Sequence, residues 1–207
     1  MITLRPIADF QLALRPTWAK IPPLPDDSGD WPLVVGKQLC DDEGKRRRLA
    51  VGLAAAHPDL LGPEPHVFAA VWVPDRTSGD LQGSVLGDWM LPDPGASLNV
   101  AYYRSLMEKA ERPHLEILAQ RMDEVTLPAG PALRIQERSS RSSGRMFTRR
   151  RTVFECVMYA VFPSESSDGL LFTFTTDALD LGDLMAKDAD AMLPTLEVLL
   201  GEPNAAI

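Results

Sequence analysis

Arginine is concentrated in one stretch of the sequence, where guanidinium groups could bind an anion or an acidic partner. Arg134 and Arg138 share one strand face by parity, and Arg149 and Arg151 share a face of the next strand. Forked guanidinium groups suit carboxylate and phosphate oxygens. We predict that these four arginines form a basic patch at one end of a sheet. The alternatives are a solvated hairpin end or ion pairs with the chain's own acids.

The other residues that often carry chemistry lack the spacing that chemistry needs. No His-Glu-x-x-His, Gly-x-Ser-x-Gly, Walker loop or Cys-x-x-Cys occurs, so we expect no metal and no cofactor. The histidines and the neighbouring carboxylate pairs are interpreted as structural or surface residues. Cys40 and Cys156 are interpreted as free thiols without a chemical role. These are His57, His66 and His114, with Asp26/Asp27, Asp41/Asp42 and Asp188/Asp190.

Composition restricts the class of partner. The 207 residues carry a formal net charge of −8, which argues against generic binding to nucleic acid or anionic membrane. No stretch approaches 18 apolar residues and the first residues do not form a signal peptide, so we expect no membrane span and a cytoplasmic location. Sixteen arginines against five lysines suggest a high-GC bacterial genome. The length favours one domain over residues 1–207.

The first half of the chain mixes strands and helices. Alternating apolar residues predict a strand at 10–14, and a compact apolar run predicts a buried strand at 67–73. A helix is expected over 31–57, with a break near Gly44 and an end at Pro58. Residues 85–91 favour a further strand.

The second half predicts an antiparallel meander between two helices. A helix over 99–111 precedes a hairpin made by 122–127 and 133–136, with 139–144 as a polar loop. Strands are expected at 146–162 and 170–175. Apolar residues at helical spacing over 181–199 predict a last helix, with Pro194 making a kink or the helix shorter than this stripe.

This order resembles the PsbP-like superfamily, which includes DcrB- and LpqN-type bacterial proteins. The resemblance is carried by the Pro-Thr-Trp that follows the first strand, by the helix at 99–111, and by the hairpin LPAGPA at 127–132. The strand pair that leads into the last helix adds to it. The resemblance implies an α+β fold, an antiparallel β-sheet flanked by helices in an α/β/α sandwich. It also implies partner binding rather than catalysis, and it assigns no functional residue.

Three functions are therefore open. We favour a non-enzymatic protein-binding or adaptor module that contacts its partner, an acidic protein in the first case, through the arginines or through an uncovered face of the sheet. A small-ligand-binding protein or an enzyme with a site built from dispersed residues is the second hypothesis, which a concave pocket with convergent polar groups would favour. An accessory factor of a secretion or envelope system is the third. An exposed edge strand could also support a homodimer.

Overall fold

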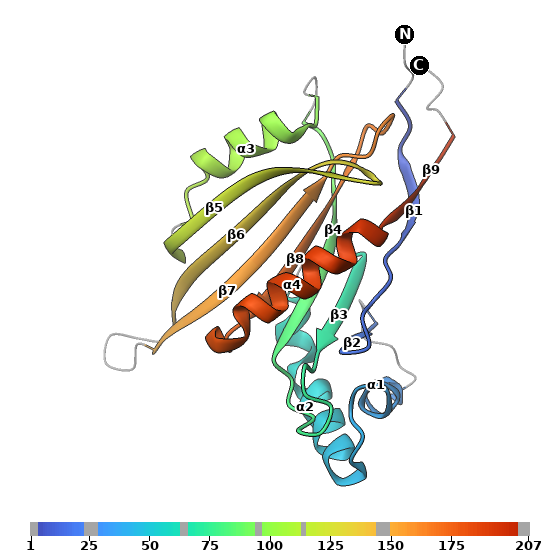
Figure 1. The fold of residues 1–207 in the computed structure, drawn as a ribbon, viewed down its shortest axis with the longest axis vertical. Helices are drawn as coiled ribbons and strands as arrows, with labels where there is room; N and C mark the ends of the chain where they lie inside the picture. The colour runs from blue at the N-terminus through green and yellow to red at the C-terminus, as the bar shows by residue number, and fades with distance from the viewer. Residues whose placement is uncertain are drawn as a thin grey trace.

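Seven antiparallel strands form the main sheet, in the order β2-β3-β4-β8-β7-β6-β5 (Figure 1). The computed structural model describes residues 4–22, 29–62, 66–93, 97–112, 115–143 and 150–202. In sheet order the strands are β2 Trp18–Lys20, β3 Phe68–Trp72, β4 Gly83–Met90, β8 Gly169–Thr176, β7 Arg150–Val161, β6 Gly130–Ser143 and β5 Leu115–Leu127.

Helices cover both faces of this sheet. One face carries α1 (Trp31–Leu39), α2 (Glu43–Leu61) and α3 (Val100–Lys109), and the other carries α4 (Gly182–Met192), which crosses in front of the sheet in Figure 1. The α+β sandwich with an antiparallel sheet is therefore confirmed. Among the described residues, no helix has the length and apolar character needed to cross a bilayer.

The strand register shows which side chains share a face. Across the sheet, Leu86 lies beside Thr173, Thr173 beside Met158, and Met158 beside Ile135. Leu86 packs with the α1/α2 cluster, whereas Met158 and Ile135 pack with α3. Both groups of helices therefore lie on one face, and Thr173 lies between them.

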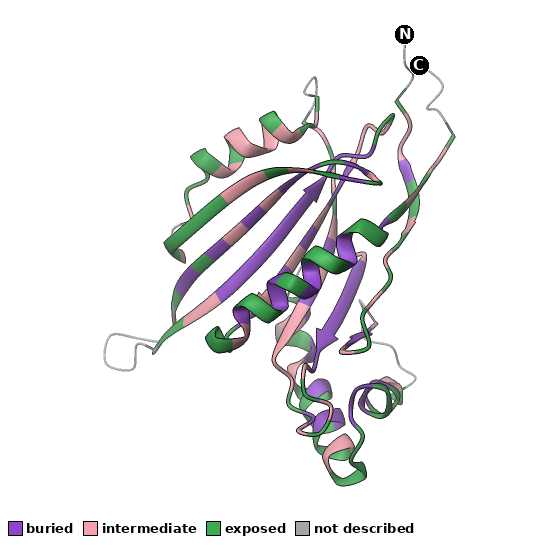
Figure 2. Ribbon diagram, in the orientation of Figure 1, coloured by how far each residue is buried: buried purple, intermediate pink, exposed green. Residues whose placement is uncertain are grey.

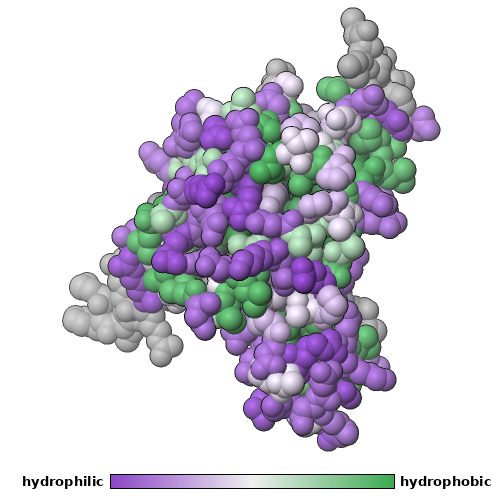
Figure 3. Space-filling view, viewed as in Figure 1, coloured by the Kyte–Doolittle hydropathy of each residue, from purple (hydrophilic) through white to green (hydrophobic). Residues whose placement is uncertain are grey.

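The opposite face is the larger core. Phe172 and Phe174 of β8 are fully buried there, together with Met185 and Met192 of α4. Figure 2 shows the buried stripe of α4 against the buried middle of the sheet, and Figure 3 shows a mainly hydrophilic outer surface over this face. The periodic apolar residues of α4 explain how this helix packs on the face, and residues of the chain ends such as Ile7 and Phe10 pack against the same core.

A separate pair of strands joins the two ends of the chain. β1 (Ile7–Gln11) pairs antiparallel with β9 (Glu197–Leu200). The expected helix through residue 199 is wrong beyond Met192, because a 3-10 turn at Leu193–Thr195 contains Pro194 and the chain then becomes extended. The shorter helix, one of the two outcomes expected from Pro194, is correct.

Two other expectations need correction. The helix over 31–57 is two helices, and the break is at Cys40 to Asp42, where the Asp42 carboxylate accepts a 2.9 Å hydrogen bond from the Lys45 amide. Pro58 does not end α2, which runs to Leu61 and stops where Gly62 takes a φ of 66°. Residues 139–143 continue β6 instead of forming a loop, and Ser139 is fully buried.

Candidate functional site

Among the described residues, nothing covers the middle of the sheet between α2 and α3, and a groove of about 600 Å³ lies there. Its floor is formed by β4, β8, β7 and β6, and its rims by the end of α2 and the segments that flank β5 and precede β4. The apolar lining consists of Leu60, Leu81, Leu115, Phe154 and Met158. The polar lining includes Gln82, Ser84, Arg112, Glu137, Arg141, Thr152, Thr173 and Thr175.

Hydroxyl groups line the floor because small polar residues occupy the inner positions of the central strands. Ser84 of β4 lies beside Thr175 of β8, and Thr173 is the next β8 residue on the same face. Neither threonine is fully buried. An apolar residue at these positions would need a helix above it, whereas a threonine can face an open groove and donate or accept one hydrogen bond.

A buried ion pair closes one end of the groove. The Glu137 side chain is only 2% exposed, and Arg112 Nη1 donates to both carboxylate oxygens, at 3.0 Å to Oε1 and 2.8 Å to Oε2. Gln120 Nε2 donates at 2.9 Å and the Ser139 hydroxyl donates as well. This carboxylate is therefore held by three side chains, as a buried charge requires.

Arg112 retains one donor without a partner. Its Nη2 atom is buried and makes no hydrogen bond to any described residue. A buried donor without an acceptor costs about 1–3 kcal/mol. The groove therefore contains a cationic group whose hydrogen-bonding capacity is not filled by the described residues.

Arg141 adds a second positive charge at the groove. Its guanidinium carbon lies 5.9 Å from the centre of the Phe154 ring, a cation–π distance. Within the described residues no carboxylate forms an ion pair with Arg141. An apolar wall and two arginines consequently meet in one groove.

Cys156 lies in the floor but is not a nucleophile. Burial raises the pKa of its thiol to about 12, and the Glu137 carboxylate adds to the increase. At neutral pH the group is a protonated thiol, whereas the thiolate is the reactive species. The groove is thus better suited to binding than to covalent catalysis.

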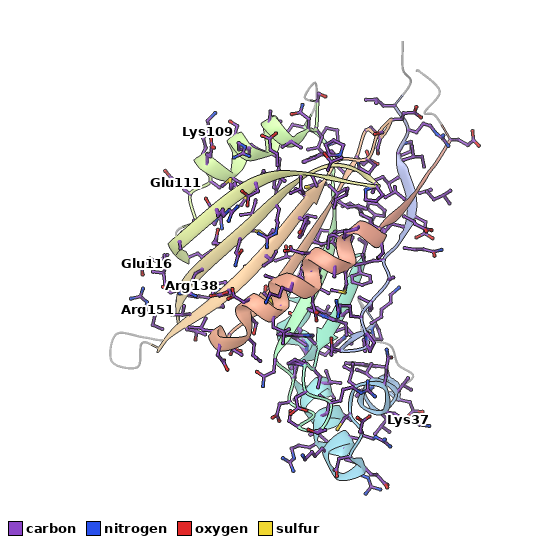
Figure 4. All side chains as sticks on the ribbon, viewed as in Figure 1. Lys37, Lys109, Glu111, Glu116, Arg138 and Arg151 are labelled. Atoms are coloured by element: carbon purple, nitrogen blue, oxygen red, sulfur yellow. The ribbon has the colours of Figure 1, made fainter. Side chains whose placement is uncertain are left out.

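The predicted arginine patch is divided among separate ion pairs on the α4 face. Arg134 Nε lies 2.8 Å from Asp190 Oδ1 of α4. Arg138 pairs with Glu155, and Arg151 Nη2 lies 2.8 Å from Glu116 Oε2. Figure 4 shows Arg138, Arg151 and Glu116 near one another at the end of β5, β6 and β7. Arg149 lies outside the described residues.

Arg134 differs from Arg138 and Arg151 in how far its side chain is buried. Its side chain is 13% exposed and forms hydrogen bonds with α4, whereas those of Arg138 and Arg151 are 52% and 51% exposed. The structure brings Arg138 and Arg151 to the same end of the sheet, and it makes Arg134 part of the helix–sheet contact. Binding of an acidic protein at this end stays a prediction.

Sequence reasoning missed a buried carboxylate on the last helix. The Asp188/Asp190 pair was expected on the polar side of the last helix, but Asp188 is buried and its Oδ2 accepts from Trp18 Nε1 at 3.0 Å and Trp72 Nε1 at 3.2 Å. Arg15 lies 3.1 Å from Oδ1. The helical spacing that places Asp188 beside Met185 and Met192 was the available signal.

Sequence reasoning also missed Arg112 and Glu137 as a site. Glu137 was noted only as the acid opposing the arginines, and Arg112 was not considered. The two are 25 residues apart, and their contact depends on how the segment after α3 turns into β5. No local spacing signals such a pair.

Comparisons with known proteins give an architectural similarity to solved structures. No protein-family model matches the chain, and the curated proteins contain no match. Among solved structures, the chain is similar to LpqN, involved in cell envelope biogenesis of Mycobacterium tuberculosis, with 9% identity and a TM-score of 0.44 over 91% of this chain and 82% of LpqN. The similarity is architectural. We draw no functional argument from it.

Proposed function

We propose that this protein binds a small amphipathic molecule with an anionic or strongly accepting group in the groove between α2 and α3. The observation that carries the proposal is the buried Nη2 of Arg112, which has no partner among the described residues, beside a mixed apolar and hydroxyl-lined groove. A volume of about 600 Å³ is within the usual range of small-ligand sites. This is the second of the three hypotheses raised by the sequence.

The lining suggests how such a ligand would lie. An apolar part would contact Leu81, Phe154 and Met158 and leave water, which is favourable in proportion to the area covered. An oxygen of the polar part would accept from Arg112 or Arg141, and a charge-assisted bond of this kind is stronger than a neutral one. Hydroxyl groups such as that of Thr173 would orient the remaining polar atoms of the ligand through hydrogen bonds.

The test uses 8-anilinonaphthalene-1-sulfonate, an aromatic sulfonate with this combination of groups. We expect saturable fluorescence enhancement with about one molecule per chain. Thr173→Phe places a ring in the groove and should abolish the saturable phase. Thr173→Val has nearly the same volume as the natural residue and should keep it.

A charge variant tests the polar end. Arg141→Gln should weaken binding of the sulfonate about tenfold and reduce its dependence on salt, because one charge-assisted contact is lost. Far-UV circular dichroism controls for folding of each variant. If Thr173→Phe and the unaltered chain bind the probe equally, the groove is not the site and the proposal fails.

The arginine end of the sheet carries a separate proposal, an acidic protein partner. Half-exposed guanidinium groups of Arg138 and Arg151 favour it. A pull-down with Arg138→Glu/Arg151→Glu should lose the partner that the unaltered chain retains. An unchanged set of bound proteins would contradict it.

A further inference from the structure

A long strand at the edge of the main sheet has no partner on its outer side among the described residues. β5 is last in the strand order, spans 13 residues and has mostly exposed side chains (Figure 1). The helix α3 packs over β6 and β7 rather than along the outer side of β5. The opposite edge, β2, has only 3 residues. Backbone groups at such an edge are available to another strand.

The β5–β6 hairpin determines which backbone groups face outward. The strands join through the two turn residues Pro128 and Ala129, with Leu127 opposite Gly130. In an antiparallel pair the hydrogen-bonded positions alternate, and the pair that closes a two-residue turn is hydrogen-bonded. Odd-numbered residues from 119 to 127 therefore bond to β6, and the N–H and C=O groups of residues 120, 122, 124 and 126 point to the open edge.

This alternation limits how a second β5 could pair with the first. Antiparallel pairing requires outward groups to meet outward groups, so even-numbered residues must lie opposite even-numbered ones. With Met122 opposite Met122 of a second copy, Arg121 lies opposite Asp123, and by symmetry this occurs twice. Ala119 then lies opposite Val125.

The neighbouring registers are unfavourable. Centring the pair on residue 121 places Arg121 opposite its own copy, and centring it on residue 123 does the same for Asp123. In the register centred on Met122 the two charged pairs occupy non-hydrogen-bonded positions, where side chains approach most closely. Charge thus favours the register centred on Met122 over its two immediate neighbours.

The charges are already close together in one chain. Arg121 Nε lies 2.8 Å from Asp123 Oδ2, and the two side chains are 76% and 34% exposed. A second copy would add the same pair in reverse order and form a cluster of four alternating charges. The strand is therefore self-complementary, as a two-fold interface requires.

We propose that β5 pairs antiparallel with β5 of a second copy of this chain, centred on Met122, to make one sheet of two subunits. The test is sedimentation equilibrium of the unaltered chain and of two charge variants. Arg121→Asp places two carboxylates opposite each other at both sites, and Asp123→Arg does the same with two guanidinium groups. We expect each single variant to dimerise about 10- to 100-fold more weakly than the unaltered chain.

Mixing the two variants gives the decisive result. In a heterodimer of Arg121→Asp with Asp123→Arg, every carboxylate again meets a guanidinium, so an equimolar mixture should regain dimers at the concentration of the unaltered chain. Arg47→Asp, the same charge change at an 80% exposed side chain of α2, should leave association unchanged. A monomeric unaltered chain, or a mixture that remains monomeric, would overturn the proposal. Groove binding of the sulfonate is measured separately and does not depend on it.

Discussion

The indole N–H of Trp18, on the short strand β2, donates a 3.0 Å hydrogen bond to the carboxylate of Asp188 on α4. Trp72 stacks on Trp18, with ring centres 5.6 Å apart, and donates to the same oxygen. One carboxylate thus connects the helix to two neighbouring strands. The contact links α4, which packs over β7 and β8, to the sheet edge that lies furthest from β5.

Replacing Asp188 with alanine should lower the free energy of unfolding by about 2–4 kcal/mol, because two buried indole donors lose their acceptor. Asp188→Asn retains one carbonyl oxygen and should cost less. Urea unfolding followed by fluorescence measures both. Asp183→Ala, at an exposed position of the same helix, should change stability by less than about 0.5 kcal/mol. Equal losses at the two positions would contradict the connecting role of Asp188.

Removing Glu137 should be more costly than removing the whole ion pair. Glu137→Ala leaves the Arg112 guanidinium without its carboxylate in a largely buried place, and we expect a loss of about 3 kcal/mol. Arg112→Met/Glu137→Met removes both charges and should lose less than Glu137→Ala. Unfolding free energies from urea titrations of single and double variants measure the coupling. Additive losses would show that the two side chains do not act as a pair.

Two glycines should respond in opposite directions to alanine. At Gly87 of β4, an added Cβ would lie 2.9 Å from Phe68 Cβ and 3.2 Å from the Phe172 ring, so Gly87→Ala should destabilise by about 1–3 kcal/mol. At Gly52, within α2, nothing lies within 4 Å of the added atom. Gly52→Ala should stabilise by about 0.5–1 kcal/mol through helix propensity. Thermal unfolding of the two variants distinguishes these effects, and a stabilised Gly87→Ala would show that Phe68 and Phe172 are less closely packed.

Stability should fall in alkaline solution partly because of Cys156. Its folded-state pKa is about 12 against an ordinary value of 9.0, so the unfolded chain releases the proton first as pH rises. The contribution is complete below pH 9.0 and is lost between this pH and about 12, at about 1.4 kcal/mol per pH unit. The pKa of Tyr159 is also raised by burial, which extends the loss above pH 10.0. Urea unfolding at pH 8.5 and 10 should show a smaller decrease for Cys156→Ala than for the unaltered chain.

The elements that local patterns define well were predictable. The apolar run of β3 is buried at every position, and the two-residue turn after Leu127 carries the expected hairpin. The helix end predicted at Pro58 was wrong, because α2 continues for one turn past this proline. Ser139 and Ser140 have the composition of a loop, yet they are strand residues because β5 and β7 both extend alongside them.

The candidate site was less predictable because it is a groove that forms where no described helix covers the sheet. Thr173 and Thr175 alternate with phenylalanines, as is typical of a strand with one solvent-exposed face. This alternation does not predict that α2 and α3 leave a gap above the threonines. The long-range pairing of Arg112 with Glu137 likewise depends on tertiary structure. The arginines were visible in the sequence, whereas the acidic partners of Arg134, Arg138 and Arg151 come from three different elements, α4, β7 and β5.

The pairing of β1 with β9 has a kinetic consequence. Residues such as Phe10 and Val198 meet across almost the whole length of the chain, so their contact closes a very long loop. The entropy of closing such a loop delays contacts of this kind until most of the sheet has formed. Amide protons of β1 and β9 should therefore exchange with deuterium through local opening, well before those of β7 and β8, and the joined ends should be the last part to fold and the first to separate.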